Sequence, residues 1–291
     1  MDLSEFAADV GNASAGPVTI AGTSSRGGAV DGVRAVVAPE GIEWIQADEM
    51  TVSCGAATKV VDLDAALGEV GQRIALPLSG TVGGALAVGH SDVRRLGYGP
   101  VRDVLLQANY VSAAGDVVKA GGPTVKNVSG FDLCRLLVGS AGTLGFLGAV
   151  ILRTRPLPQV SQWFSTATDP WATFAVLYRP VSVLWDGTTT WALLEGHADD
   201  VREQAVLASL TEAEGPPPLP TTGRWSLPPA GLTALAATTG FVAEIGVGVV
   251  HHTQPAPQRS LSAPLVALHQ RLKTEFDPFG RLNPGVDLLD G

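Results

Sequence analysis

Cysteine is scarce in this chain: only Cys54 and Cys134 occur among 291 residues, and they lie far apart in the sequence. Two separated cysteines exclude a disulfide framework, and they exclude an iron–sulfur cluster held by this chain alone. No set of His, Asp and Glu residues has the spacing of a metal site, so we expect none. Both cysteines are expected to be buried, reduced thiols of a cytoplasmic protein.

Charged residues are also few. They make up 16% of the chain, against 45% hydrophobic residues, and the formal net charge is −9. The basic stripe typical of nucleic-acid binding proteins is absent. No run approaches the roughly 18 apolar residues of a membrane helix, and the first residues lack the pattern of a signal peptide. We therefore expect a cytoplasmic protein with a sizeable core, no nucleic-acid partner and no direct insertion into a membrane.

Two common nucleotide signatures are missing, G-x-G-x-x-G and G-x-x-x-x-G-K-[ST], which disfavours nicotinamide dinucleotides and nucleoside triphosphates as ligands. In their place the chain has glycine-rich loops at residues 22–25 (GTSS), 80–84 (GTVGG) and 139–145 (GSAGTLG). Glycine lets the backbone approach a ligand closely and present N–H groups to a diphosphate. Each loop alone is typical of an ordinary turn, but together they favour a single nucleotide-cofactor domain.

The hydrophobic pattern predicts alternating short strands and helices. We expect a helix over residues 59–70 with Thr58 as its cap, a hairpin about residues 114–116, and helices over residues 199–213 and 263–275. The alternation over residues 241–252 predicts one strand. Two prolines, at residues 156 and 158, and a change in amino-acid composition after them suggest a domain boundary there.

Five blocks of the sequence carry a resemblance to a known family. They are residues 80–87 (GTVGGALA), 95–103 (RLGYGPVRD), 126–133 (KNVSGFDL), 139–145 and 276–285 (FDPFGRLNPG). In this order they resemble the flavin adenine dinucleotide (FAD) binding domain of the vanillyl-alcohol oxidase and p-cresol methylhydroxylase (PCMH) family. Within that family, the resemblance is to the flavin-binding subunits of bacterial glycolate oxidase.

The resemblance implies a fold and a division into domains. The fold would be α+β: a two-lobed PCMH-type FAD-binding domain, a small α+β cap domain, and a C-terminal segment that returns to the FAD domain. We place these parts at residues 1–155, 156–245 and 246–291.

The resemblance also implies which residues would contact FAD. Residues 21–25 and 80–84 would hold the pyrophosphate, and residues 95–102 would pass near the flavin. Residues 126–132 would border the ring or the ribityl chain, residues 142–146 would meet the adenosine, and Asn283 would close over the isoalloxazine. The expected cofactor-binding residues are Ala21, Gly22, Thr23, Ser24, Ser25, Gly80, Thr81, Val82, Gly83, Gly84, Arg95, Lys126, Asn127, Gly130, Asp132, Gly142, Thr143, Gly145, Phe146 and Asn283.

The first loop contains neither histidine nor cysteine, whereas members of the family with covalent flavin carry a histidine there. We therefore expect the FAD to be non-covalently bound. The resemblance further implies a complex with a second flavin subunit and an iron–sulfur subunit, located in the cytoplasm and held at the inner face of the membrane through these partners.

Oxidation of a small 2-hydroxy acid by hydride transfer to flavin also needs a base and a cation for the carboxylate. On a single strand over residues 241–252, Glu244 and His252 would frame a smooth face made by two glycines, which points to His252 as the base and leaves His251 as the second candidate. Arg224 is the candidate cation. The alternative for His251 and His252 is a structural pair at a strand end.

Two other functions stay open. The chain would be an electron-relay or structural subunit if it bound flavin without a substrate site of its own, and the few cations after residue 156 favour this. A stand-alone flavin reductase of the same fold is the third hypothesis.

Overall fold

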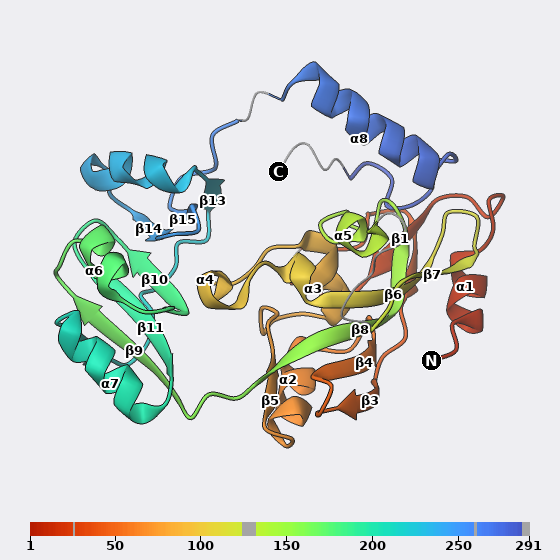
Figure 1. Ribbon diagram of the computed structural model, residues 1–291. Helices are drawn as coiled ribbons and strands as arrows, with labels where there is room; N and C mark the ends of the chain where they lie inside the picture. The colour runs from red at the N-terminus through yellow and green to blue at the C-terminus, as the bar shows by residue number, and fades with distance from the viewer. Residues whose placement is uncertain (26, 124–131, 259–260, 287–291) are drawn as a thin grey trace. The chain divides into compact units, whose positions relative to one another are not determined.

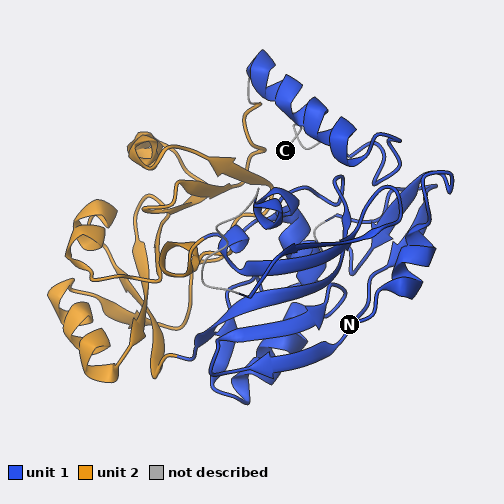
Figure 2. Cartoon of the chain, turned by 45° about the vertical axis from the view of Figure 1, so that its right-hand side comes forward, with its two compact units in different colours: residues 1–91, 100–157, 261–291 blue, residues 92–99, 158–260 orange. Residues whose placement is uncertain are grey.

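The computed structural model describes residues 1–25, 27–123, 132–258 and 261–286 (Figure 1). The chain divides into two compact units. Unit 1 comprises residues 1–91, 100–157 and 261–291, and unit 2 comprises residues 92–99 and 158–260 (Figure 2). Three separate stretches of sequence therefore build unit 1.

The described residues of unit 1 form two sheets and several helices. Its elements are α1 (Ser4–Val10), β1 (Val18–Ala21), β2 (Arg34–Val37), β3 (Ile42–Gln46), β4 (Thr51–Gly55), α2 (Val60–Gly68), β5 (Gln72–Ile74), α3 (Val82–Val88), η1 (Val101–Asp103), β6 (Leu105–Val111), β7 (Val117–Gly121), α5 (Leu133–Leu137), β8 (Phe146–Pro156) and α8 (Ala263–Phe276). Strands β1 and β2 pair in parallel, and the larger sheet has the order β3-β4-β8-β6-β7, with β5 also paired to β8.

Strand β8 is the centre of the larger sheet, because it pairs with β4 on one side and β6 on the other. Its first seven residues are all buried, which explains why its sequence is a continuous apolar run. Helices α2 and α3 place Leu63, Leu67 and Leu86 in the same core. The predicted hairpin about residues 114–116 is confirmed as the β6–β7 turn.

A buried arginine ties the segment after α8 to the start of the chain. Arg281 is 2% exposed, and its guanidinium donates to the carbonyl oxygens of Val10 (2.7 Å), Gly11 (2.9 Å), Gly16 (2.9 Å) and Ala113 (2.6 Å). Two of these carbonyls end helix α1, where a cation is also favoured by the helix dipole.

Asp277 holds the backbone that carries this arginine. Its carboxyl oxygens accept from the N–H groups of Arg281 (3.0 Å) and Leu282 (2.8 Å), and Lys273 of α8 donates to it at 2.7 Å. Burial, aided by nearby Arg34, lowers the pKa of Arg281, while Asp277 opposes that shift. The segment is therefore fixed by its own turn as well as by the carbonyls it reaches.

Unit 2 is built on a seven-stranded sheet among the described residues, in the order β12-β9-β11-β10-β14-β15-β13. Its elements are α4 (Arg95–Tyr98), β9 (Val160–Thr166), α6 (Pro170–Val176), β10 (Ser182–Trp185), β11 (Thr190–Gly196), α7 (Ala198–Leu207), β12 (Thr211–Ala213), β13 (Gly223–Ser226), η2 (Pro229–Ala237), β14 (Phe241–Glu244) and β15 (Val249–His252). Trp185 makes edge contacts with Trp171 and Phe241 in the core of this unit.

The division into units differs from the expected boundaries in two places. Residues 246–260 belong to unit 2, not to the returning segment, because β15 lies between β14 and β13. Residues 92–99 also belong to unit 2: Gly97 donates to the carbonyl of Val181 at 3.1 Å, and the Tyr98 hydroxyl donates to Glu195 at 2.6 Å. The segment that returns to unit 1 begins at residue 261.

Two predicted helices differ from the structure at their ends. Helix α2 begins at Val60, and the Thr58 hydroxyl bonds the backbone of Gly41 instead of capping the helix. Helix α7 ends at Leu207 because Ser209 takes a positive φ of 52°, and the predicted last residues of that helix form strand β12.

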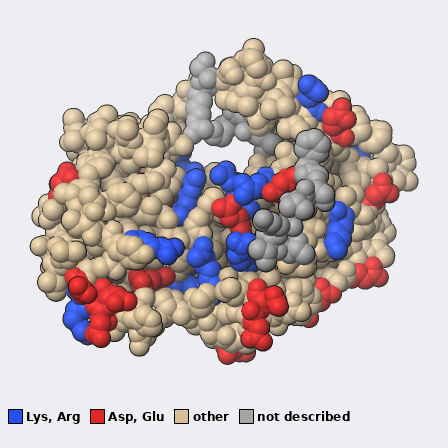
Figure 3. Space-filling model, in the orientation of Figure 1, with Lys and Arg blue, Asp and Glu red and all other residues tan. Residues whose placement is uncertain are grey.

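Most of the surface in view is formed by uncharged residues, in keeping with the composition (Figure 3). Acidic side chains gather over α7, where Asp199, Asp200 and Glu203 are exposed. No helix within the described ranges is long and apolar enough to cross a membrane.

The two thiols should resist modification in the folded chain. Cys54 and Cys134 are 0% and 3% exposed, and burial raises the pKa of Cys54 to about 12 and that of Cys134 to about 11. Thiolate is the reactive form, so little of it exists at pH 8. We expect a disulfide reagent such as DTNB to leave both thiols intact in the native chain and to modify both in urea. Rapid modification of the native chain would contradict the described packing.

Removing the Arg281 guanidinium should destabilise unit 1. Arg281→Met keeps much of the length and leaves buried carbonyl oxygens without their donor, so we expect a loss of about 3 kcal/mol in the free energy of unfolding. Urea unfolding followed by circular dichroism measures this. The control is Arg271→Met, on the exposed surface of α8, which should change stability by less than about 0.5 kcal/mol. Equal free energies of unfolding for the two variants would show that the hydrogen bonds of Arg281 contribute nothing to stability.

Candidate cofactor site and histidine cluster

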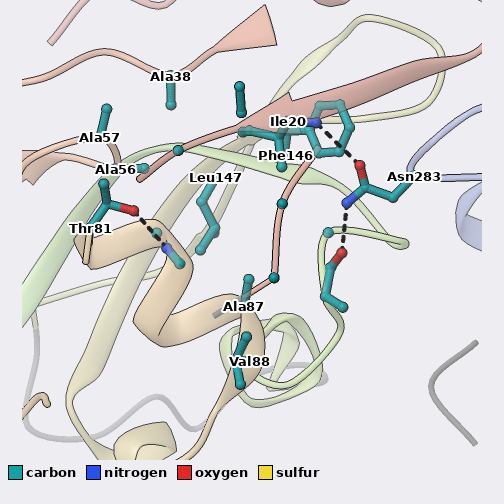
Figure 4. A pocket seen from close by; sticks show the side chains of 18 of the residues that line it. Ile20, Ala38, Ala56, Ala57, Thr81, Ala87, Val88, Phe146, Leu147 and Asn283 are labelled. Atoms are coloured by element: carbon teal, nitrogen blue, oxygen red, sulfur yellow. Dashed lines mark hydrogen bonds between the residues drawn. The ribbon is translucent and has the colours of Figure 1, made fainter. Parts of the chain in front are cut away.

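One cavity of about 230 Å³ in unit 1 gathers the three glycine-rich loops (Figure 4). It is lined by most of the expected cofactor-binding residues, namely Ala21, Gly22, Thr23, Ser24, Ser25, Thr81, Gly83, Gly84, Gly142, Gly145, Phe146 and Asn283. These residues come from stretches that lie up to about 260 positions apart in the sequence, as the bond between Thr19 and Asn283 spans 264 positions. The fold therefore turns separate sequence motifs into one concave surface.

The first loop leaves strand β1 and lies beside the second. Ser24 has a positive φ of 55°, and the Thr23 hydroxyl donates to Ser25 at 3.2 Å. A methyl group on Gly22 would lie 3.7 Å from the Thr81 hydroxyl oxygen. The hydroxyl-bearing parts of the two loops thus share one wall.

The second loop begins helix α3. The Thr81 hydroxyl caps this helix by accepting from the Gly84 N–H at 3.1 Å. Gly83 donates to the carbonyl of Ala56 at 2.7 Å, and a Cβ at Gly83 would approach that residue to 3.0 Å. Glycine at this position therefore allows the loop to pack against the residue that follows β4.

The third loop is tied to the end of α3. Gly139 and Ala141 donate to the carbonyls of Leu86 (3.0 Å) and Ala87 (2.8 Å). Ala141 and Gly142 take positive φ angles of 47° and 71°. This tight turn directs Gly142 into the cavity.

Asn283 joins the loops from the returning segment. Its side-chain oxygen accepts from the Thr19 hydroxyl at 2.8 Å. The same oxygen accepts from the Ile20 N–H (3.1 Å), and the side-chain nitrogen donates to the carbonyl of Ala141 at 2.7 Å (Figure 4). Its backbone N–H donates to Val18 at 2.9 Å. A single amide therefore connects β1 with the third loop.

The cavity has a chemistry suited to a dinucleotide. Among its described lining residues there is no charged side chain, so hydroxyls and backbone N–H groups are the available donors. Concave backbone of this kind holds phosphate oxygens without cations. Another part of the cavity wall is formed by the small side chains of Ala38, Ala56, Ala57 and Ala87 (Figure 4). Because these side chains are small, they leave room for flat rings.

The remaining expected cofactor residues lie elsewhere. Lys126, Asn127 and Gly130 lie outside the described residues. Gly80 and Val82 do not line the cavity, because Val82 is fully buried in the core and the Gly80 carbonyl accepts from Val60. Thr143 does not line the cavity, and its carbonyl oxygen accepts from Nζ of Lys273. Two more do not line it either: Asp132 caps α5, and Arg95 belongs to unit 2.

Sequence reasoning missed several wall residues, including Gly27, Gly28, Ala56, Ala57 and Val286. A signal existed for the alanines, since these small residues directly follow the buried strand β4. The glycine pair follows the first loop and could have been added to it.

The prediction of one strand over residues 241–252 is wrong. Strands β14 and β15 form a hairpin whose turn contains Gly246 and Gly248, with positive φ angles of 79° and 88°. The chain reverses there, so Glu244 pairs opposite Val249 and shares a face with His251, not with His252. The two glycines that suggested a smooth face are turn residues.

His252 has the contacts of a structural residue. It is 1% exposed, stacks on Trp225 with ring centroids 4.0 Å apart, and its Nδ1 accepts from the Gln254 N–H at 2.9 Å. A neutral histidine that accepts at Nδ1 carries its proton on Nε2 and has no free lone pair. This geometry does not suit His252 as a base.

His251 has a carboxyl partner. Its Nε2 lies 2.9 Å from Oε1 of Glu244, and the Glu244 side chain is 3% exposed. Arg224 on β13 is the register partner of His251, so both side chains leave the same face of the sheet. The structure thus brings together two of the three expected catalytic residues and adds Glu244. The described residues contain no group able to hold a metal.

Comparison with known proteins identifies the family. Residues 13–121 match the FAD binding domain family, a range that contains the first two loops. Glycolate oxidase subunit GlcE of Escherichia coli (strain K12) is 30% identical, and the match covers 81% of each chain. The chain belongs to this family of FAD-binding subunits.

Shorter matches and one fold likeness agree with this family. D-lactate dehydrogenase of Archaeoglobus fulgidus is 38% identical over 38% of this chain and 26% of its own length. Alkyldihydroxyacetonephosphate synthase has the same fold, with a TM-score of 0.66 and 14% identity over 97% of this chain and 72% of its own. The expected family, the PCMH-type α+β fold and FAD as the cofactor are confirmed.

A methyl group at Gly142 should weaken FAD binding. It would lie 2.7 Å from the Asn283 amide nitrogen and 3.3 Å from Phe146. We expect Gly142→Ala to raise the Kd for FAD about tenfold, or ~1.4 kcal/mol, in titrations of apoprotein followed by flavin fluorescence. Gly139→Ala is the matched control, because Gly139 has a similar φ of 84° with nothing within 4 Å of the added methyl. The same Kd for both variants would contradict the view that the contact between Gly142 and Asn283 shapes the FAD site.

Proposed function

We propose that this FAD-dependent oxidoreductase is the FAD-binding subunit of a dehydrogenase complex that oxidises glycolate or a related 2-hydroxy acid. The observation that carries the proposal is the likeness to the glycolate oxidase subunit over 81% of both chains. A 39% identical match to glycolate oxidase subunit GlcD of Bacillus subtilis, over 28% of this chain and 17% of that one, supports the same substrate class.

In this proposal the cavity of unit 1 holds FAD. Residues 22–25 offer N–H and hydroxyl donors to the diphosphate, and the Thr81 hydroxyl offers one more. Gly83 and Gly84 leave room for the ligand because they have no side chain, and Asn283 keeps the third loop in place. Bound FAD supplies the acceptor for the hydride of the substrate. The chain itself must bind the carboxylate and accept the hydroxyl proton, since neither task belongs to the flavin.

The FAD is non-covalent in our proposal. No histidine, cysteine or tyrosine is among the described residues that line the cavity. Side chains of these types form the usual covalent links to flavin, so the geometry offers none of them.

Electrons leave through partner subunits in this proposal. Cys54 and Cys134 lie far apart in the sequence, and both are buried. Neither is therefore a ligand of an iron–sulfur cluster at the surface. We propose a second flavin subunit and an iron–sulfur subunit as partners. The complex would act in the cytoplasm, peripheral at the inner face of the membrane through those partners.

A second candidate is an electron-relay subunit without substrate chemistry of its own. The scarcity of arginine and lysine in unit 2 favours it, and Arg202, one of the few, is exposed and paired with Asp199 at 2.8 Å. This candidate keeps the flavin site but makes the partner subunit the place of oxidation.

Anaerobic mixing with glycolate separates the two candidates. The purified chain should be yellow, and acid precipitation should release intact FAD. If the chain oxidises the acid, glycolate alone bleaches its visible flavin absorbance; if it is a relay, bleaching needs the partner subunits. A flavin that stays oxidised with glycolate and also with lactate, with all co-purifying partners present, would refute both.

A further inference from the structure

Helix α8 has little apolar packing against the rest of unit 1. None of its 14 residues, all of which the structure describes, is buried, and the side chains of Leu265 and Leu268 are exposed. Phe276, its last residue, packs against the core of unit 1. A helix of this length depends on tertiary contacts more than on propensity. The few contacts that hold α8 therefore decide how stable it is.

A hollow lies between α8 and the third glycine-rich loop. It has a volume of about 580 Å³, and its lining includes Val266 and Leu272 of α8, Leu136 of α5 and Leu144 of the loop. Side chains that border a hollow lack part of the dispersion energy of a packed core. Packing alone thus attaches α8 weakly to the loop.

The ammonium group of Lys273 bridges α8 and this loop. Its Nζ donates to the carbonyl oxygen of Thr143 at 2.9 Å. It also donates to Oδ2 of Asp277 at 2.7 Å and to the carbonyl oxygen of Leu282 at 3.1 Å. An ammonium group has three N–H donors, so these bonds use all of them. One side chain therefore joins α8, the third loop and the segment that follows α8.

Asp277 fixes the position of this ammonium group. The Asp277 side chain is fully buried and lies four residues after Lys273. Its two oxygens also accept from the backbone N–H groups of Arg281 and Leu282. The carboxylate thus holds Lys273 at the end of α8, where the helix dipole also favours a cation.

The two carbonyl groups that Lys273 reaches flank the bond between Asn283 and Ala141. Thr143 closes the turn that contains Ala141, because its N–H and its hydroxyl donate to the carbonyl of Ser140 at 2.9 and 2.8 Å. The carbonyl of Leu282 belongs to the same peptide group as the N–H of Asn283. The bond from Asn283 to Ala141, at 2.7 Å, is therefore supported on both sides.

We infer that Lys273 is a positioning residue of the FAD site and that it couples the stability of α8 to occupancy of the cavity. This rests on the proposed function, which places FAD in the cavity of unit 1. A ligand that favours the ordered third loop also favours the bonds of Lys273, and those bonds favour α8. Thermodynamic linkage makes the effect reciprocal, so the attachment of α8 raises the affinity for FAD.

The coupling transmits the presence of the cofactor to the surface of unit 1. Leu265 and Leu268 are exposed on α8 and do not line the cavity. The FAD-loaded chain and the FAD-free chain then differ in the stability of the helix that carries these side chains.

Hydrogen–deuterium exchange of the wild-type chain, with and without FAD, tests the coupling. The amides of α8 should exchange about tenfold more slowly at saturating FAD, a factor within the usual range for coupled sites. Helix α7 is the reference, because none of its residues lines the cavity, and its exchange should not change. Unchanged exchange of α8 would overturn the inference, and so would equal slowing of both helices.

Lys273→Met tests the residue itself, since methionine keeps much of the length and has no N–H donor. The Kd for FAD should rise about tenfold in titrations of the FAD-free chain followed by flavin fluorescence. Exchange of α8 should also lose its response to FAD. A purely structural lysine would instead change that exchange by the same factor with and without FAD.

Arg271→Met is the matched control, because it makes the same kind of substitution at an exposed position of α8. It should keep the wild-type Kd and the wild-type response of α8 to FAD. An equal Kd in Lys273→Met and the wild type would overturn the inference and leave the proposed function standing. If the wild-type chain binds no FAD, the proposed function fails and the inference fails with it. The exchange experiment on the wild type gives its answer even if Lys273→Met does not fold.

Discussion

The hydrogen bonds from Arg281 to four carbonyl oxygens are the constraint on which the cofactor cavity depends. They fix the returning segment against the end of α1 and the β6–β7 turn. Leu282 then pairs with Val18 beside β1, and Asn283 reaches the third loop. A guanidinium suits this task because its planar fork offers five donors and stays charged even when burial lowers its pKa. The position of the Asn283 amide in the cavity thus depends on the buried guanidinium of Arg281, two residues earlier in the sequence.

The two units differ in the polar groups that they offer. Unit 1 uses backbone, hydroxyls and small side chains, which suits a long cofactor that must be gripped along its length. Unit 2 places the ionisable side chains of Arg224, Glu244 and His251 on one face of its sheet. The described residues that line the cavity of unit 1 carry no charged side chain.

Sequence reasoning found the loops because glycine and hydroxyl residues are needed locally for close backbone approach, and that need is visible in each motif. Asn283 was found only through the resemblance to a family. Arg281 escaped notice because its partners are carbonyl oxygens, which any residue supplies, so no sequence pattern marks them. The hairpin of β14 and β15 was missed because Gly246 and Gly248 fit both an open strand face and a turn. That error alone moved the expected partner of Glu244 from His251 to His252.

The contact between Thr19 and Asn283 spans 264 positions. During synthesis, the first glycine-rich loop leaves the ribosome long before Asn283, whose amide bonds the end of β1, has been added. The nascent chain can pair β1 with β2 and can assemble the larger sheet, yet one wall of the cavity is still missing. The complete cavity therefore forms only late in biogenesis, after both sheets of unit 1 and the returning segment have come together.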